Sequence, residues 1–205
     1  MKYDLADSSL CQIAGISSSV EIELNRQGIK SPAQLGKYAE MFFSKSKKQK
    51  INASVARYAK FRKLELVDAI VNSFPCGHRV RILYDLFEYA MFLDIETDGI
   101  GPSAGITCVS TLMNGKLRTF VYGRDLDDFL DEWANAKVLV TYNGKRFDVP
   151  IIQKTFGLTC VPAHIDMMDE SRHYGFKGGL KEIERKVGYQ TQLAEKLKKL
   201  KTGEY

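Results

Sequence analysis

The chain has 205 residues, an apolar fraction of 44% and a formal net charge of +5 at neutral pH. Its length fits one ordinary domain plus a smaller one, and its composition is that of a globular protein. No stretch approaches the roughly 20 apolar residues that span a bilayer, so no membrane partner is expected. The four cysteines are scattered without a C-x-x-C pair, which favours a reducing, cytoplasmic setting.

Charge is distributed unevenly along the chain. Residues 1–90 hold 14 Lys/Arg and 9 Asp/Glu, residues 91–170 hold 7 and 12, and residues 171–205 hold 9 and 4. An acidic centre between basic segments suits a metal-dependent enzyme on a polyanion, because carboxylates hold metal ions and cations hold phosphates. Each basic run taken alone is equally typical of a solvated helix face.

Residues 1–85 are predicted to form an all-helical region. Ser31 before Pro32 is typical of an N-cap followed by proline at the first helical position. The other expected elements are a basic polar loop over Lys45–Lys50, one helix from Ala53 to Asn72, a break at Pro75–Gly77 and a short helix over Arg79–Phe87.

Residues 86–205 are predicted to form a separate α/β domain. Its expected strands are Tyr89–Asp94, Ile106–Met113, Lys116–Tyr122, Lys137–Thr141 and Val161–Asp166. Asn114-Gly115 indicates a tight hairpin between the second and third strands. Helices are expected after Asp125, from Asp148 to about Phe156, and from Leu180 to about Val187.

The first strand ends in a pair of carboxylates. In a strand, residues two apart point to the same face, so Asp94 and Glu96 lie side by side while Ile95 turns the other way. Two neighbouring anions at the end of a buried strand repel each other and resist desolvation. A bound Mg²⁺ or Mn²⁺ ion, which prefers oxygen ligands, would relieve both costs. The alternative is a strand end that simply reaches solvent.

A second motif follows the fourth strand. Asn143-Gly144 indicates a tight turn, and Asp148 with Pro150 stands at the start of the next helix, where proline is tolerated. The strand–turn–helix order brings Asp148 to a strand edge, where it could face Asp94 and Glu96. This second motif favours a metal site over a solvated strand end.

These motifs resemble those of a known superfamily. Phe92-Leu93-Asp94-Ile95-Glu96-Thr97 and Asn143-Gly144-x-x-Phe147-Asp148-x-Pro150 look like the first two motifs of DEDD-type 3′–5′ exonucleases. His164-Ile165-Asp166-Met167-Met168-Asp169 followed by Gly178-Gly179-Leu180 is similar to the YprB-type branch of predicted exonucleases. The resemblance implies a ribonuclease H-like mixed sheet, three antiparallel strands followed by parallel strands, with flanking helices.

The resemblance also implies a two-metal hydrolysis of phosphodiester bonds. Two Mg²⁺ or Mn²⁺ ions would clamp the attacking water and the leaving oxygen. Asp94 would be shared by both ions, and Glu96 would bind one ion and orient the water. Asp148 would complete the coordination shell of the second ion. The implied partner is DNA or RNA, with a single-stranded end as the substrate.

One family feature has no match in this sequence. The family carries a fourth carboxylate on a late helix, a few residues after a Tyr or His. After Gly188 the acids are Glu195 and Glu204, and neither has that setting, so the last catalytic helix is expected to be missing from residues 86–205. The spacing from His164 to Asp169 is similar to the family motif, but it comes early in the chain. The alternative is a partly buried, hydrogen-bonded His164.

The N-terminal region carries a fainter resemblance. Ile13-Ala14-Gly15-Ile16, with Gly28-Ile29 further on, is similar to one helix-hairpin-helix unit, although Ser17 replaces its second glycine. Such a unit binds nucleic-acid backbone, and the alternative is a helical packing module.

Two functions follow for the whole chain. The first is a metal-dependent 3′–5′ exonuclease. The second is a ribonuclease H-like protein that binds nucleic acid, or acts as a scaffold, with impaired catalysis.

Overall fold

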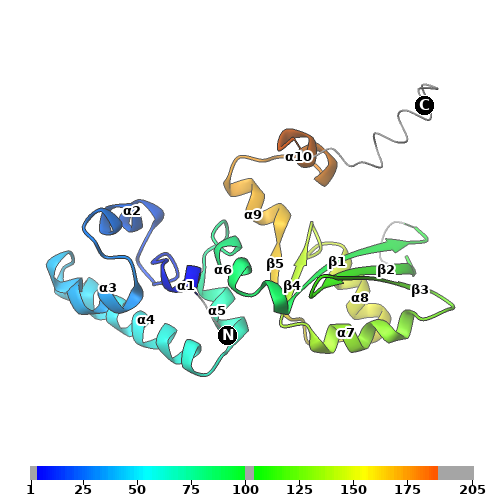
Figure 1. Ribbon diagram of the computed structural model, residues 1–205, viewed down its shortest axis with the longest axis horizontal. Helices are drawn as coiled ribbons and strands as arrows, with labels where there is room; N and C mark the ends of the chain where they lie inside the picture. The colour runs from blue at the N-terminus through cyan, green and yellow to red at the C-terminus, as the bar shows by residue number, and fades with distance from the viewer. Residues whose placement is uncertain (1–3, 100–103, 189–205) are drawn as a thin grey trace.

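The computed structural model describes residues 4–99 and 104–188 (Figure 1). The N-terminal part is helical, as predicted: α1 (Asp4–Asp7), α2 (Ser18–Arg26), α3 (Pro32–Tyr38), α4 (Lys45–Lys63), α5 (Val67–Ser73) and α6 (Val80–Asp85), with the 3₁₀ turns η1 (Ala39–Met41) and η2 (Phe87–Tyr89). No helix within this described part is long and apolar enough to cross a membrane.

The remainder alternates strands and helices. Its strands are β1 (Ala90–Thr97), β2 (Ile106–Met113), β3 (Lys116–Val121), β4 (Val138–Thr141) and β5 (Ala163–Asp166). Its helices are η3 (Leu126–Asp128), α7 (Phe129–Asn135), α8 (Asp148–Phe156), α9 (Met167–His173) and α10 (Leu180–Lys186). The sequence predicted every one of these strands to within about three residues, because each is a short apolar run bounded by turn residues.

The five strands form one sheet in the order β3-β2-β1-β4-β5. Strand β2 pairs antiparallel with β1 and β3, whereas β4 pairs parallel with β1 and β5. This confirms the predicted ribonuclease H-like mixed sheet. The β2–β3 turn is also as predicted: Asn114 and Gly115 have φ angles of 49° and 71°, which a two-residue hairpin turn requires.

Apolar clusters pack on both faces of the sheet, on one of them only in part. On one face, Met91, Leu93 and Ile95 of β1 belong to a buried cluster with helices α7 and α8, which lie below the sheet in Figure 1. On the other face, a second cluster joins the N-terminal helices to the sheet through Ala90, Val138, Val140, Ala163 and Ile165. Helix α5 packs directly against β5. The helical region therefore shares its core with the sheet.

Two expectations for the helical region were wrong. Residues 45–50 are not a loop but the first turns of α4. Lysine is a good helix former, and here Lys48 pairs with Glu40 while the ammonium of Lys47 lies 4.6 Å from the Phe43 ring centroid. The single helix expected over 53–72 is divided in two at Glu65, whose φ of 50° no α-helix accommodates.

The predicted N-cap at Ser31 is confirmed, since its side chain accepts a hydrogen bond from the Gln34 amide at 3.3 Å. Helix α9 was not expected at all. It begins directly at the end of β5, where Asp166 supplies the N-cap by accepting a hydrogen bond from the Met168 amide at 3.0 Å. Residues beyond 188, where the last catalytic helix is expected to be missing, lie outside the described residues.

Phe129 contacts three other aromatic rings in the buried cluster between the sheet and helices α7 and α8. It is fully buried, and its ring contacts those of Phe120, Trp133 and Phe156 at centroid distances of 6.0, 5.8 and 5.6 Å. We expect Phe129→Ala to lower the free energy of unfolding by about 4 kcal/mol, because it removes these contacts and leaves a cavity. Urea unfolding monitored by circular dichroism measures the change. The control is Leu117→Ala on β3, where the side chain is 74% exposed and the expected change is below about 0.5 kcal/mol.

Candidate active site

Asp94 and Glu96 extend from the same face of β1, and both are exposed. Ile95 between them is buried on the opposite face. Partial burial, and then the nearby charge of Glu96, raise the pKa of Asp94 above its ordinary value. The two carboxylates therefore repel each other and resist burial, as the sequence predicted for this pair. The strand register becomes irregular directly after Glu96, as is common where a strand presents a functional group.

The sheet face that carries these carboxylates is open across three strands. Asp94 pairs with Ser110 of β2, which in turn pairs with Thr119 of β3. Antiparallel partners project to the same side of a sheet, and none of these side chains is buried. A polymer can therefore reach Asp94 along this face.

Asp148 is the first residue of α8 and is only 4% exposed. Its Oδ1 accepts a hydrogen bond from the backbone amide of Ile95 at 3.2 Å, so it lies against β1 between the positions of Asp94 and Glu96. Burial, together with the charge of Asp94, raises the pKa of Asp148 to about 6. The third predicted site residue therefore meets the same segment of β1 as the first two.

The turn before α8 explains why the motif contains Asn-Gly. Asn143 adopts a left-handed conformation with φ of 66°, which asparagine tolerates better than most residues. The amide of Gly144 donates to the Thr141 hydroxyl at 3.1 Å, and a Cβ atom at Gly144 would collide with that side chain. These two residues shape the turn, which is the role that the sequence assigned to Asn143.

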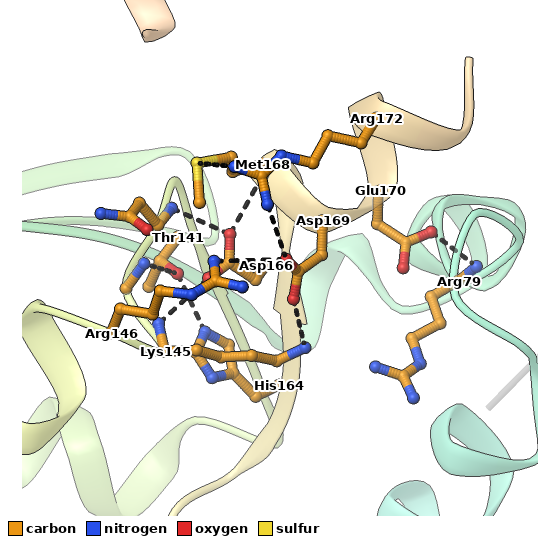
Figure 2. Close-up of polar contacts among 12 residues, drawn as sticks. Arg79, Thr141, Lys145, Arg146, His164, Asp166, Met168, Asp169, Glu170 and Arg172 are labelled. Carbon is orange, nitrogen blue, oxygen red and sulfur yellow. Dashed lines mark hydrogen bonds and ion pairs between the residues drawn. The ribbon is translucent and has the colours of Figure 1, made fainter. Parts of the chain in front are cut away.

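Asp166 anchors this turn, and sequence reasoning missed it. Its side chain is 1% exposed and accepts hydrogen bonds from the amides of Asn143 at 2.8 Å, Lys145 at 3.0 Å and Met168 at 3.0 Å (Figure 2). One carboxylate thereby joins the turn before α8 to the start of α9. The available signal was an aspartate placed between an apolar strand and a helical run, which is typical of an N-cap.

His164 and Asp169 make separate interactions. The Nε2 atom of His164 lies 2.9 Å from the Thr141 hydroxyl, and burial lowers the pKa of His164 to about 4. Asp169 pairs instead with Lys145 at 3.1 Å and Arg146 at 3.5 Å (Figure 2). Although partial burial opposes them, these two cations hold the pKa of Asp169 below its ordinary value. His164 is thus the partly buried, hydrogen-bonded histidine of the alternative interpretation.

The carboxylates fit a weakly coordinated divalent ion. Among the described residues, no group of three or more His, Cys, Asp or Glu side chains lies close enough to hold an ion. Asp94 and Glu96 nevertheless offer two oxygen donors whose mutual repulsion a cation would relieve. Mg²⁺ is commonly held by one or two carboxylates together with water and substrate phosphates, and this donor set suits that mode.

The low pKa of His164 predicts a pH-dependent stability. Between about pH 4 and 6.5 the unfolded chain binds a proton that the folded protein excludes, so stability rises with pH across this window by roughly 3 kcal/mol. Glutamine does not titrate, so His164→Gln should lose less stability on acidification. Urea unfolding of both proteins at several pH values measures the difference. The opposite titration of Asp148 is common to both proteins and cancels, and parallel profiles would contradict the assignment.

Comparison with known proteins adds a family to this geometry. A family model described as RNase_H superfamily matches residues 91–201, which is more than half of the chain and includes Asp94, Glu96 and Asp148. No curated protein and no solved structure matches the chain. A nuclease-type function on nucleic acid is what this superfamily indicates. With its sheet order and its acidic strand end, the chain belongs to the RNase H superfamily.

Proposed function

We propose that this protein is a metal-dependent nuclease, a 3′–5′ exonuclease similar to the DEDD type and to its YprB-like branch. One observation carries the proposal. Asp94 and Glu96 stand on an open strand face, and Asp148 is hydrogen-bonded to the amide of Ile95 between them at 3.2 Å. Three acids around one strand end, in a member of this superfamily, match the arrangement expected for phosphodiester hydrolysis.

Each carboxylate has a distinct proposed role. Asp94 and Glu96 would hold Mg²⁺ or Mn²⁺, with Asp94 shared between two ions. Asp148 would complete the shell of the second ion through water, because one of its oxygens already accepts the Ile95 amide. When bound, such ions supply Lewis-acid stabilisation of the attacking water and of the leaving oxygen. The raised pKa values of Asp94 and Asp148 support these roles, since a cation would bring both carboxyl groups to the ionised form.

The open sheet face favours a single-stranded end as substrate. Ser110 and Thr119 continue the row of polar side chains from Asp94 across β2 and β3, and neither of these two side chains is buried. A flexible nucleic-acid strand can follow such a surface with its terminal phosphodiester at the carboxylates.

For residues 1–85, the division into a separate nucleic-acid-binding domain stays a prediction.

The second candidate is a protein that binds nucleic acid without cutting it. It is favoured by the lack, within residues 4–99 and 104–188, of three side chains converging on one ion position. The two functions differ in one measurable property, the metal-dependent loss of full-length substrate.

We expect Asp94→Asn to reduce Mn²⁺-dependent degradation of a labelled single-stranded oligonucleotide by about a thousandfold or more, because the variant removes a charged ligand at the strand end. A 5′ label and a 3′ label, resolved on a denaturing gel, report the direction of the ladder. Calorimetric titration with Mn²⁺ gives an independent readout, in which the variant should bind the ion more weakly than the parent protein.

The matched control is Asp131→Asn, which removes an exposed acid from α7, the helix packed on the sheet face opposite Asp94, and should keep parental activity. Undiminished cleavage by the Asp94 variant would refute the assignment of the site. A parent protein that binds the oligonucleotide but never shortens it, with either metal, would establish the second candidate instead.

A further inference from the structure

A group of basic side chains lies on the turn that leads from β4 to Asp148 and on the neighbouring helix α9, and it has no part in the function proposed so far. Lys145 and Arg146 precede α8, and Arg172 comes from α9. All three surround the carboxylate of Asp169, at 3.1, 3.5 and 4.0 Å (Figure 2). We call Lys145, Arg146 and Arg172 the basic cluster. Three cations around one anion leave a formal excess of two positive charges.

The side chains of the basic cluster reach solvent beyond their counter-ion. Those of Arg146 and Arg172 are 56% and 52% exposed, that of Lys145 is 35% exposed, and that of Asp169 is only 20% exposed. The cations therefore form the outer layer and the carboxylate lies beneath them. An anion arriving from solvent can contact the guanidinium groups without first displacing Asp169.

The backbone that presents the cluster is held in place by buried interactions. Asp166 accepts hydrogen bonds from the amides of Asn143 and Lys145 on one side and of Met168 on the other. Further along α9, the buried Glu170 accepts a hydrogen bond from the Arg79 amide at 3.0 Å (Figure 2). Both segments that carry the cluster are thus fixed, and less conformational entropy is lost when they bind a ligand.

The cluster also has a defined position relative to the carboxylates. Lys145 and Arg146 belong to the short turn that ends at Asp148, which contacts the amide of Ile95. Asp94 and Glu96 repel a phosphate, whereas cations on the turn before Asp148 attract one, so a strand held at this turn has its next phosphates close to the carboxylates.

Stability does not account for this arrangement. Exposed ion pairs contribute between about 0 and 1 kcal/mol, so three cations competing for one carboxylate add little.

We propose that Lys145, Arg146 and Arg172 form a binding site for the phosphodiester backbone of single-stranded nucleic acid, and that Asp169 acts as a counter-ion that weakens this binding. The proposal deepens the proposed nuclease function by naming where the substrate strand is held. Arginine suits this role because its planar fork matches two phosphate oxygens.

The test measures binding without cleavage. Fluorescence anisotropy of a labelled single-stranded oligonucleotide of about 20 nucleotides is followed in EDTA, from about 50 to 200 mM KCl, with the full chain. We expect Arg146→Ala to bind about fivefold more weakly at about 0.1 M salt, and to lower the slope of log K against log salt by about 0.7. Arg146→Lys, which keeps the charge, should retain most of the affinity.

The Asp169→Asn variant separates the two possible roles of Asp169 by the sign of the change in affinity. Removing the counter-ion frees the cations, so this variant should bind about threefold or more tightly than the parent. A purely structural role for Asp169 predicts the opposite sign, since a loosened α9 would weaken binding. Thermal melting of each variant confirms that it is folded.

The matched control is Arg118→Ala on β3, which removes an arginine of similar exposure (54%) that pairs with Glu132 of α7 at 3.2 Å, on the sheet face opposite Asp94. It should keep parental affinity. Unchanged binding by Arg146→Ala, or an Asp169→Asn variant no tighter than the parent, would overturn the proposal. Because no metal is present, this result is independent of whether Asp94 supports cleavage, and each proposal can fail alone.

Discussion

The length difference between two neighbouring strands determines where the candidate site lies. Strand β1 pairs with β4 only as far as Phe92, yet it continues to Thr97. Beyond that point the side of β1 that faces β4 has no strand partner, and an unpaired buried amide is costly. Asp148 takes over this role by accepting the Ile95 amide. One hydrogen bond therefore satisfies the backbone and brings a third acid to the segment that bears Asp94 and Glu96.

The cores on the two sheet faces hold that strand end in place. Ile95 is anchored among side chains of α7 and α8, and Ala90 is anchored against the N-terminal helices. A strand fixed on both sides cannot rotate its acids apart, so the repulsion between them persists in the folded protein. Burial, and then the charge of a neighbouring carboxylate, raises the pKa of both Asp94 and Asp148. A cation at this strand end would favour the ionised form of both groups.

Two aspartates near the β5–α9 junction have different roles at the edge of the candidate site. Asp166 is buried and bonds only to backbone amides, so it fixes the geometry of the turn before α8. Asp169 lies nearer the surface and bonds to side chains, so it determines the charge that the turn displays. Geometry and charge at the edge of the candidate site are thus controlled separately, within four positions of the chain.

Local patterns in the sequence predict the strands, their alternation and the common face of Asp94 and Glu96, because strand periodicity is local. They also predict the Asn143-Gly144 turn, which depends on backbone sterics. The prediction of a loop over residues 45–50 was wrong, because contacts with Glu40 and Phe43 favour a helix there. The contact of Asp148 with Ile95, and the sharing of Asp169 by Lys145 and Arg172, depend on the tertiary fold. These contacts join residues on different elements, and no spacing rule along the chain encodes which partners the parallel crossovers bring together.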